Sequence, residues 1–165
     1  MFFMNKLNGG SRAPFFIFMM KLICPIEIID LHGEGFHLFI HAKAGRKKCR
    51  LLIDTGASST VFDQTRLKKL FPEGELTELN RLSTGLGTDS MSGFLSLIPK
   101  LKIGGLSILN LSVIVLNLSH VNKSYKQLGF PPIEGVLGSD LLHKFKAEID
   151  YGNAEIRFTQ NLITK

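Results

Sequence analysis

The sequence contains few cysteines and fewer acidic than basic residues. Its 165 residues include two cysteines, Cys24 and Cys49, which do not form a C-x-x-C pair. Two cysteines do not make a disulfide framework, and the missing spacing argues against a metal site. We therefore expect two reduced thiols in a cytoplasmic protein. Fourteen acidic and 20 basic residues give a formal net charge of +6, which favours acidic partners but has no bearing on the fold.

A long hydrophobic run is also missing. The unbroken apolar stretch from Pro14 to Met20 is too short to span a bilayer, and Lys21 ends it. No A-x-A-like cleavage site follows it, as a secretory signal would require. We expect no membrane partner. Residues 1–19 are expected to be a leader or disordered extension outside a single domain of residues 20–165.

Several catalytic and binding signatures are absent. No G-x-S-x-G elbow occurs, and no Gly-rich phosphate loop lies between a strand and a helix. His32, His37 and His41 are close in sequence, but no carboxylate or cysteine completes a metal shell. The basic run from Lys43 to Arg50 has no interleaved aromatic residues for base stacking, so we interpret it as a solvated turn. We expect no metal, no cofactor and no nucleic-acid partner.

Short apolar runs separated by turn residues predict an all-β protein. Residues 36–54 indicate a hairpin in which Phe36, Leu38 and Ile40 alternate with polar neighbours and face inward. Two further strands flank the turn Gly104-Gly105, and a polar loop is expected from His120 to Pro132. Two short helices are predicted, one beginning at Asp63 and one after Gly138, capped by Ser139 or Asp140.

The segment "LLIDTGASSTVF" carries the strongest chemical signal. Leu51 to Ile53 predict the end of a buried strand, and Asp54-Thr55-Gly56 then predict a tight turn. A carboxylate at such a strand end is expected to be partly desolvated, which makes its proton affinity adjustable. Two carboxylates in contact can share one proton and act as base and acid together. Asp54 alone lacks that partner.

This segment resembles the active-site motif of aspartic proteases of the pepsin and retropepsin type. "GVLGSDLL", from Gly135 to Leu142, resembles the second element of that family, and "KAEIDYGNAEIRF" is similar to the end of one lobe. The resemblance implies a closed pepsin/retropepsin-like β-barrel lobe with one or two short helices. It also implies hydrolysis of peptide bonds by an activated water, without a cofactor. Because the motif occurs once, the resemblance implies a homodimer in which Asp54 meets Asp54 of a second copy.

The resemblance also assigns the site residues. Asp54, Thr55 and Gly56 correspond to the catalytic turn, and the tip from Ser83 to Gly93 corresponds to the flap that closes over an extended peptide substrate. The positions expected to contact substrate are Ala57, Ser58, Thr84, Gly85, Leu86 and Gly87.

The sequence has alanine at position 57, as retroviral enzymes do, where pepsin-like lobes have serine. It differs from retroviral enzymes at positions 58 and 139, and its flap lacks their glycine series. Ala57 has no hydroxyl to stabilise the ionised carboxylate, so we expect activity nearer neutral than strongly acidic pH. Retroviral enzymes often carry an acid and an arginine where this chain has Ser58 and Ser139. Both halves of that brace are therefore missing, and other groups must contribute to the dimer contact.

Other interpretations remain open. Asp54 can be a turn-capping residue. Asp150 is more readily interpreted as a turn residue of the closing hairpin, and Asp140 as a helix cap. The whole chain can be a peptide-binding or scaffolding dimer that keeps the fold without turnover. It can also be a basic nucleic-acid-binding β-domain, with Arg46, Lys47 and Lys48 as the contact.

Overall fold

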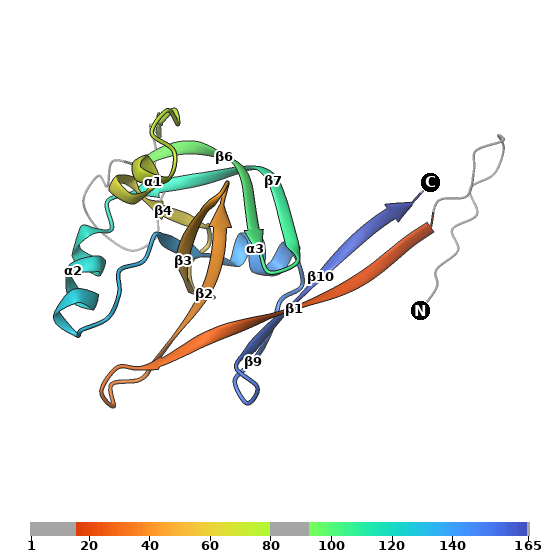
Figure 1. Cartoon of the computed structure of the whole chain (residues 1–165), viewed down its shortest axis with the longest axis horizontal. Coiled ribbons are helices and arrows are strands. Elements are labelled where there is room, and N and C mark those ends of the chain that lie inside the picture. Colours follow the sequence, from red (N-terminus) through yellow and green to blue (C-terminus); the bar gives the residue numbers. More distant parts are fainter. Residues whose placement is uncertain (1–15, 80–92, 165) are drawn as a thin grey trace.

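The computed structural model describes residues 16–79 and 93–164. Ten strands and three helices are found in this part of the chain (Figure 1). The strands are β1 (Phe16–Asp30), β2 (Phe36–Ala44), β3 (Lys47–Ile53), β4 (Val61–Asp63), β5 (Thr77–Leu79), β6 (Gly93–Ile103), β7 (Leu106–Leu116), β8 (Gly135–Leu137), β9 (Glu148–Asp150) and β10 (Glu155–Thr164). The helices are α1 (Gln64–Leu70), α2 (Ser119–Gln127) and α3 (Ser139–Lys144).

Six of these strands close into a barrel. The sheet order is β5-β6-β7-β4-β8-β3-β2-β1-β10-β9, and an additional pairing of β6 with β2 joins the two sides. The main core lies inside this ring, with fully buried side chains such as Leu51, Phe62, Ile98 and Leu101. The predicted all-β fold class with a closed barrel is confirmed, with three short helices in the described residues instead of the expected one or two.

Most predicted elements occur where the sequence placed them. The hairpin of β2 and β3 turns at Gly45-Arg46, and β6 and β7 turn at Gly104-Gly105. Helix α1 begins after Asp63, whose carboxylate accepts a hydrogen bond from the Arg66 amide at 2.9 Å. This is the predicted N-cap.

The structure corrects the sequence-based prediction in three places. Helix α2 replaces part of the polar loop expected from His120 to Pro132; it has no side-chain cap at its start and buries only Tyr125, so it carried little helical signal. Phe36 is 63% exposed rather than inward, because it lies at the first position of β2, at the open end of the strand. Helix α3 begins after Gly138, and neither Ser139 nor Asp140 is its N-cap.

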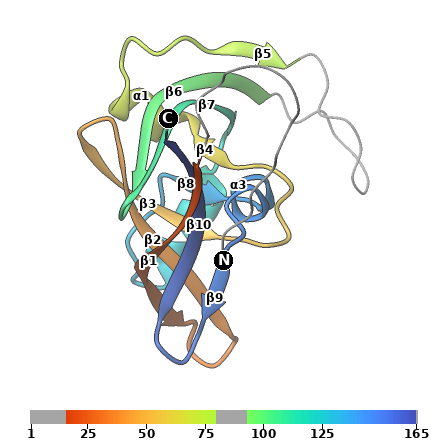
Figure 2. The same ribbon diagram turned by 90° about the vertical axis from the view of Figure 1, so that its right-hand side faces the viewer.

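The first and last long strands pair with each other and leave the barrel. Phe16–Pro25 of β1 lies antiparallel to residues 155–164 of β10, whereas β1 pairs with β2 only from Ile26 onwards. Figure 1 shows the resulting ribbon projecting from the body of the molecule, and Figure 2 views it from its free end, in front of the barrel. Residues 16–19, which the prediction assigned to an extension, lie in this strand, and the domain boundary at residue 19 stays a prediction.

Candidate active site

The Asp54 turn follows the buried end of β3. Leu51 and Ile53 are buried, and the Asp54 amide donates to the carbonyl of Leu137 in β8 at 3.1 Å. Asp54 Oδ1 accepts a hydrogen bond from the Gly56 amide at 2.8 Å, which folds the side chain back over its own turn. In the described part of the chain no other group donates to this carboxylate. The Asp54 side chain is exposed. A single copy of the chain therefore does not bury this carboxylate, although its place at a strand end predicted partial burial.

The segment that follows the Asp54 turn lies in very close contact with the backbone directly after β8. The Gly138 amide donates to Thr60 Oγ1 at 3.1 Å, and the Ser139 amide donates to the carbonyl of Ala57 at 2.7 Å. A Cβ on Gly138 would lie 2.5 Å from the carbonyl carbon and oxygen of Ser59, so this crossing requires glycine. The sequence placed Gly138 beneath the turn, and the contact explains why a side chain cannot stand there.

Thr60 and Asp140 hold this crossing together. The buried Thr60 hydroxyl donates to Asp140 Oδ1 at 2.7 Å, and the Leu141 amide donates to the same oxygen at 2.8 Å. Asp140 therefore ties the first turn of α3 to the loop after Asp54. This role is structural, as the sequence suggested, although the residue does not cap the helix.

A buried arginine joins β3 to the segment that leads into β8. Arg50 is 6% exposed; its Nε donates to Glu27 at 2.9 Å, and its Nη1 donates to the Pro131 carbonyl at 3.0 Å. The Arg50 amide donates to Glu134 Oε2 at 2.8 Å, and Glu134 also pairs with Arg66. These bonds fix the start of β8 against β3 and so set the position of the Asp54 turn. Sequence analysis missed them, because Arg50 appeared as one charge within a basic run.

Helix α2 adds a second small core beside the site. Tyr125 packs with Phe39 and Ile133, and its hydroxyl lies 2.7 Å from His37 Nδ1. Burial raises the pKa of Tyr125, the charge of Arg50 lowers it, and the charge of Asp54 raises it. Burial is the largest of these causes, and the pKa of Tyr125 is raised overall. Because helix α2 was not predicted, the burial of Tyr125 was not predicted either.

The predicted site residues fall into two groups. Asp54, Thr55, Gly56, Ala57 and Ser58 lie together in one turn, in which Ala57 is half-buried and the other four are exposed. The predicted flap positions lie outside the described residues, namely Thr84, Gly85, Leu86 and Gly87. Their contact with substrate stays a prediction.

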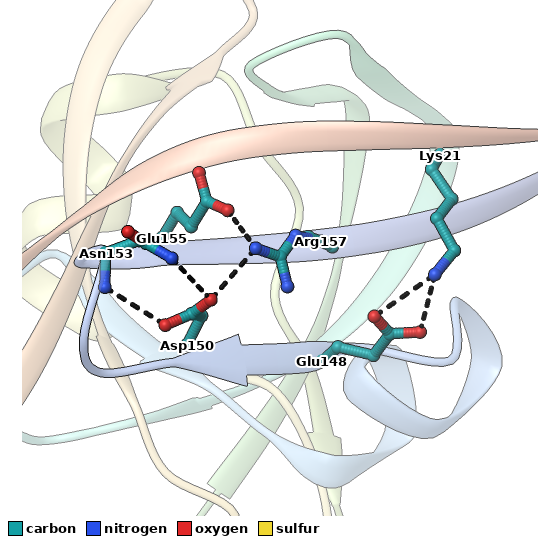
Figure 3. Close-up of polar contacts among 6 residues, drawn as sticks. All are labelled: Lys21, Glu148, Asp150, Asn153, Glu155 and Arg157. Atoms are coloured by element: carbon teal, nitrogen blue, oxygen red, sulfur yellow. Dashed lines mark hydrogen bonds and ion pairs between the residues drawn. The ribbon is translucent and has the colours of Figure 1, made fainter.

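Asp150, the other aspartate in an Ile-Asp-x-Gly context, is held by its own hairpin. Its carboxylate accepts bonds from the Asn153 amide at 3.0 Å, from Asn153 Nδ2 at 2.9 Å and from Arg157 Nη2 at 2.9 Å (Figure 3). The hydrogen bonds from Asn153, together with Arg157, lower the pKa of Asp150 to about 2. The Asp150 carboxylate is therefore occupied by hydrogen bonds that hold its own hairpin, as expected of a turn residue.

Each of the three clustered histidines has a separate partner. His32 stacks on Phe130, His37 contacts Tyr125, and His41 Nε2 lies 3.7 Å from Glu27. Within residues 16–79 and 93–164, no group of three His, Cys, Asp or Glu side chains is placed to hold a metal ion.

Both cysteines are free and buried. Burial and the nearby charge of Glu134 raise the pKa of Cys49 to about 12, and burial raises that of Cys24. These thiols are protonated at neutral pH and act as small core residues.

The chain matches the family model described as aspartyl protease over residues 40–141. This is more than half of the sequence, so the chain belongs to the aspartyl protease family. No curated protein matches it in sequence. In the described part of the chain, none of the helices has both the length and the apolar character needed to cross a membrane.

Two solved structures share its fold. A retropepsin-like aspartic protease from Rickettsia conorii superposes with a TM-score of 0.52 at 19% identity, covering 93% of this chain and 100% of that one. The retroviral protease-like domain of Ddi1 from Leishmania major gives a TM-score of 0.51 at 12% identity, covering 76% and 94%. At these identities the likeness establishes a retropepsin-like fold alone.

Proposed function

We propose that the chain is an aspartic endopeptidase whose active site is completed by a second copy. The observation that carries this proposal is the Asp54 turn: a rigidly supported carboxylate, exposed and accepting one hydrogen bond, in a member of the aspartyl protease family. A single carboxylate cannot serve as base and acid at once, so the partner acid has to come from elsewhere. A two-fold axis beside Asp54 supplies it without any further motif.

The proposed reaction uses one shared proton. The ionised Asp54 takes a proton from a water molecule held between the two carboxylates, and that water attacks the peptide carbonyl. The protonated Asp54 of the other copy donates its proton to the carbonyl oxygen, and the pair later protonates the leaving nitrogen. Thr55 and Gly56 shape the turn around the dyad, and no cofactor enters the scheme.

The ribbon of β1 and β10 supports the proposed assembly. In its outer half, β1 and β10 pair only with each other among the described strands, although the Thr159 amide also donates to the Phe145 carbonyl at 2.7 Å; exposed strand edges can pair with another chain. Apolar side chains on it are exposed, including Met19 at 58% and Ile23 at 60%. We propose that the ribbon forms part of the dimer contact. This contact replaces the acid–arginine pair that retroviral enzymes often have and that Ser58 and Ser139 cannot form.

The remaining parts of the proposal concern substrate, pH and location. An extended peptide lies beneath the flap that contains Thr84 to Gly87 and contacts Ala57 and Ser58. Ala57 offers no hydroxyl to the ionised dyad, so the pH–rate profile is expected to peak nearer neutrality; a maximum below about pH 3.5 would reject this part. Two buried reduced thiols agree with a cytoplasmic location.

A cleavage assay on a mixed peptide library tests the proposal. The wild type should release products, and Asp54→Asn should lower the rate by on the order of 10³-fold or more. The matched control is Asp150→Asn, which removes the same charge in the same local sequence and should keep the rate within about threefold. If wild type and Asp54→Asn behave alike, the chain is instead a peptide-binding or scaffolding module.

A further inference from the structure

A cavity of about 540 Å³ lies on the barrel away from the Asp54 turn. This volume falls in the range typical of sites for small molecules. Its lining residues come from β2, β3, β6 and the turn after β6: His41, Ala42, Lys43, Lys48, Lys102 and Gly104. None of them belongs to the residues assigned to catalysis, so the proposed protease function does not account for it.

Three lysines stand side by side in this cavity. The strand register places Lys43 opposite Lys48 on one side and opposite Lys102 on the other. Their strand neighbours Ala42 and Ile103 are buried, so the three ammonium groups share the outer face of the sheet. Like charges directly opposite each other destabilise a sheet, and here this happens across two successive strand pairs.

Among the described residues, no acidic side chain lines the cavity to balance these charges. Glu27 lies 3.7 Å from His41, one of the lining residues, and already accepts a bond from Arg50. The basic run itself is divided: Lys47 donates to the Lys69 carbonyl at 2.5 Å, whereas Lys48 lines the cavity. Lys47 and Lys48 therefore lie in different surroundings, although both are exposed.

A second cavity of about 280 Å³ shares His41 and Gly104 with the first one. Cys24, Pro25 and Ile26 line it, so it is mainly apolar, with Glu27 at one side. The two cavities together can hold a molecule that has a highly charged anionic end and a small apolar part.

We propose that the Lys43–Lys48–Lys102 cavity is a binding site for the phosphate groups of a small molecule. Three cations at cross-strand spacing require several negative charges in a small volume, which a phosphate or polyphosphate supplies and a single carboxylate does not. Lysine serves as a point-charge ligand for phosphate. Among the described residues, no Phe, Tyr or Trp side chain lines either cavity to stack on a base, which argues against a nucleic-acid strand. This site is independent of the proposed peptidase activity.

Isothermal titration of the full chain with inorganic tripolyphosphate at low salt tests the site. The wild type should bind, and the double variant Lys43→Gln/Lys102→Gln should weaken binding by at least about tenfold. The control Lys123→Gln/Lys126→Gln removes the same charge from α2 and should change binding by less than about twofold. A melting curve verifies folding; relief of the like-charge contacts should leave the pocket variant at least as stable as the wild type.

Three results would overturn the proposal. The first is equal weakening in the two double variants, and the second is no binding of tripolyphosphate at millimolar concentration. The third is binding of a DNA duplex through the same lysines when tripolyphosphate does not bind. Vesicles of phosphatidylcholine with phosphatidylinositol bisphosphate identify the source of the phosphate. Lysine-dependent sedimentation with them assigns it to a lipid headgroup, and binding of tripolyphosphate alone assigns it to a soluble compound.

Discussion

Two aspartates of this chain stand in the same local sequence, Ile-Asp-x-Gly, and have opposite environments. Asp150 holds its own hairpin together through Asn153 and Arg157 (Figure 3). Asp54 accepts one hydrogen bond from its own turn, and the support of that turn comes from outside, through Gly138 and its neighbours. A carboxylate that stabilises its loop is not available for chemistry. A carboxylate whose loop is stabilised by other groups is free to react.

The largest stability effect is expected at Gly138, and Gly152 in the Asp150 hairpin provides the comparison. Gly138→Ala would place a Cβ 2.5 Å from backbone atoms of Ser59, which cannot move aside cheaply. Denaturant unfolding should show a loss of about 3 kcal/mol or more, together with loss of cleavage. Gly152→Ala would place its Cβ 3.5 Å from Asp150 Oδ1, an ordinary contact, and should stay within about 1 kcal/mol of wild type. Equal costs at the two positions would contradict the difference in support.

A smaller loss is expected when the support of the Asp54 turn loses one hydroxyl. Thr60→Val removes the acceptor of the buried Gly138 amide and the donor to Asp140. An unsatisfied buried amide should lower the unfolding free energy by about 2 kcal/mol. Thr65→Val on the exposed face of α1 is the matched control and should change it by less than about 0.5 kcal/mol. A similar loss in both variants would mean that the Thr60 bonds do not support the turn.

The smallest effect is expected from acid titration of the Asp150 hairpin. Its pKa is lowered from 3.8 to about 2 in the folded state. The carboxylate therefore stabilises the fold above its unfolded pKa, and this contribution disappears as the pH falls through the folded value. The melting temperature of Asp150→Asn should lie below that of wild type near neutrality, and the gap should close between about pH 4 and pH 2. A gap that is independent of pH would show that the ionised form is not what stabilises the hairpin.

The sequence was informative where a local pattern determines the structure. Alternating apolar residues predicted β2 and β3, Gly104-Gly105 marked the turn between β6 and β7, and Asp63 marked the start of α1. The Asp54 turn and Gly138 were likewise found through their short-range motifs. These features depend on neighbouring residues, so one stretch of sequence contains the signal.

Features that depend on distant partners were missed. Arg50 is buried because Glu27 and Pro131 meet it from other parts of the chain. Tyr125 is buried because α2 packs on Phe39, and α2 itself has no side-chain bond from its N-cap residue and buries only Tyr125. The row of Lys43, Lys48 and Lys102 depends on strand register across a non-consecutive pairing. No local pattern records such long-range neighbours.

Mixing active and inactive chains tests most directly whether each site contains one Asp54 from each of two copies. Wild type and Asp54→Asn are refolded together in different ratios so that mixed dimers form, and the cleavage rate is measured at constant total protein. If both copies contribute to one site, activity should follow the square of the wild-type fraction, so an equal mixture keeps about a quarter of the rate. A linear dependence, with about half of the rate in the equal mixture, would show that each chain works alone and would contradict the account.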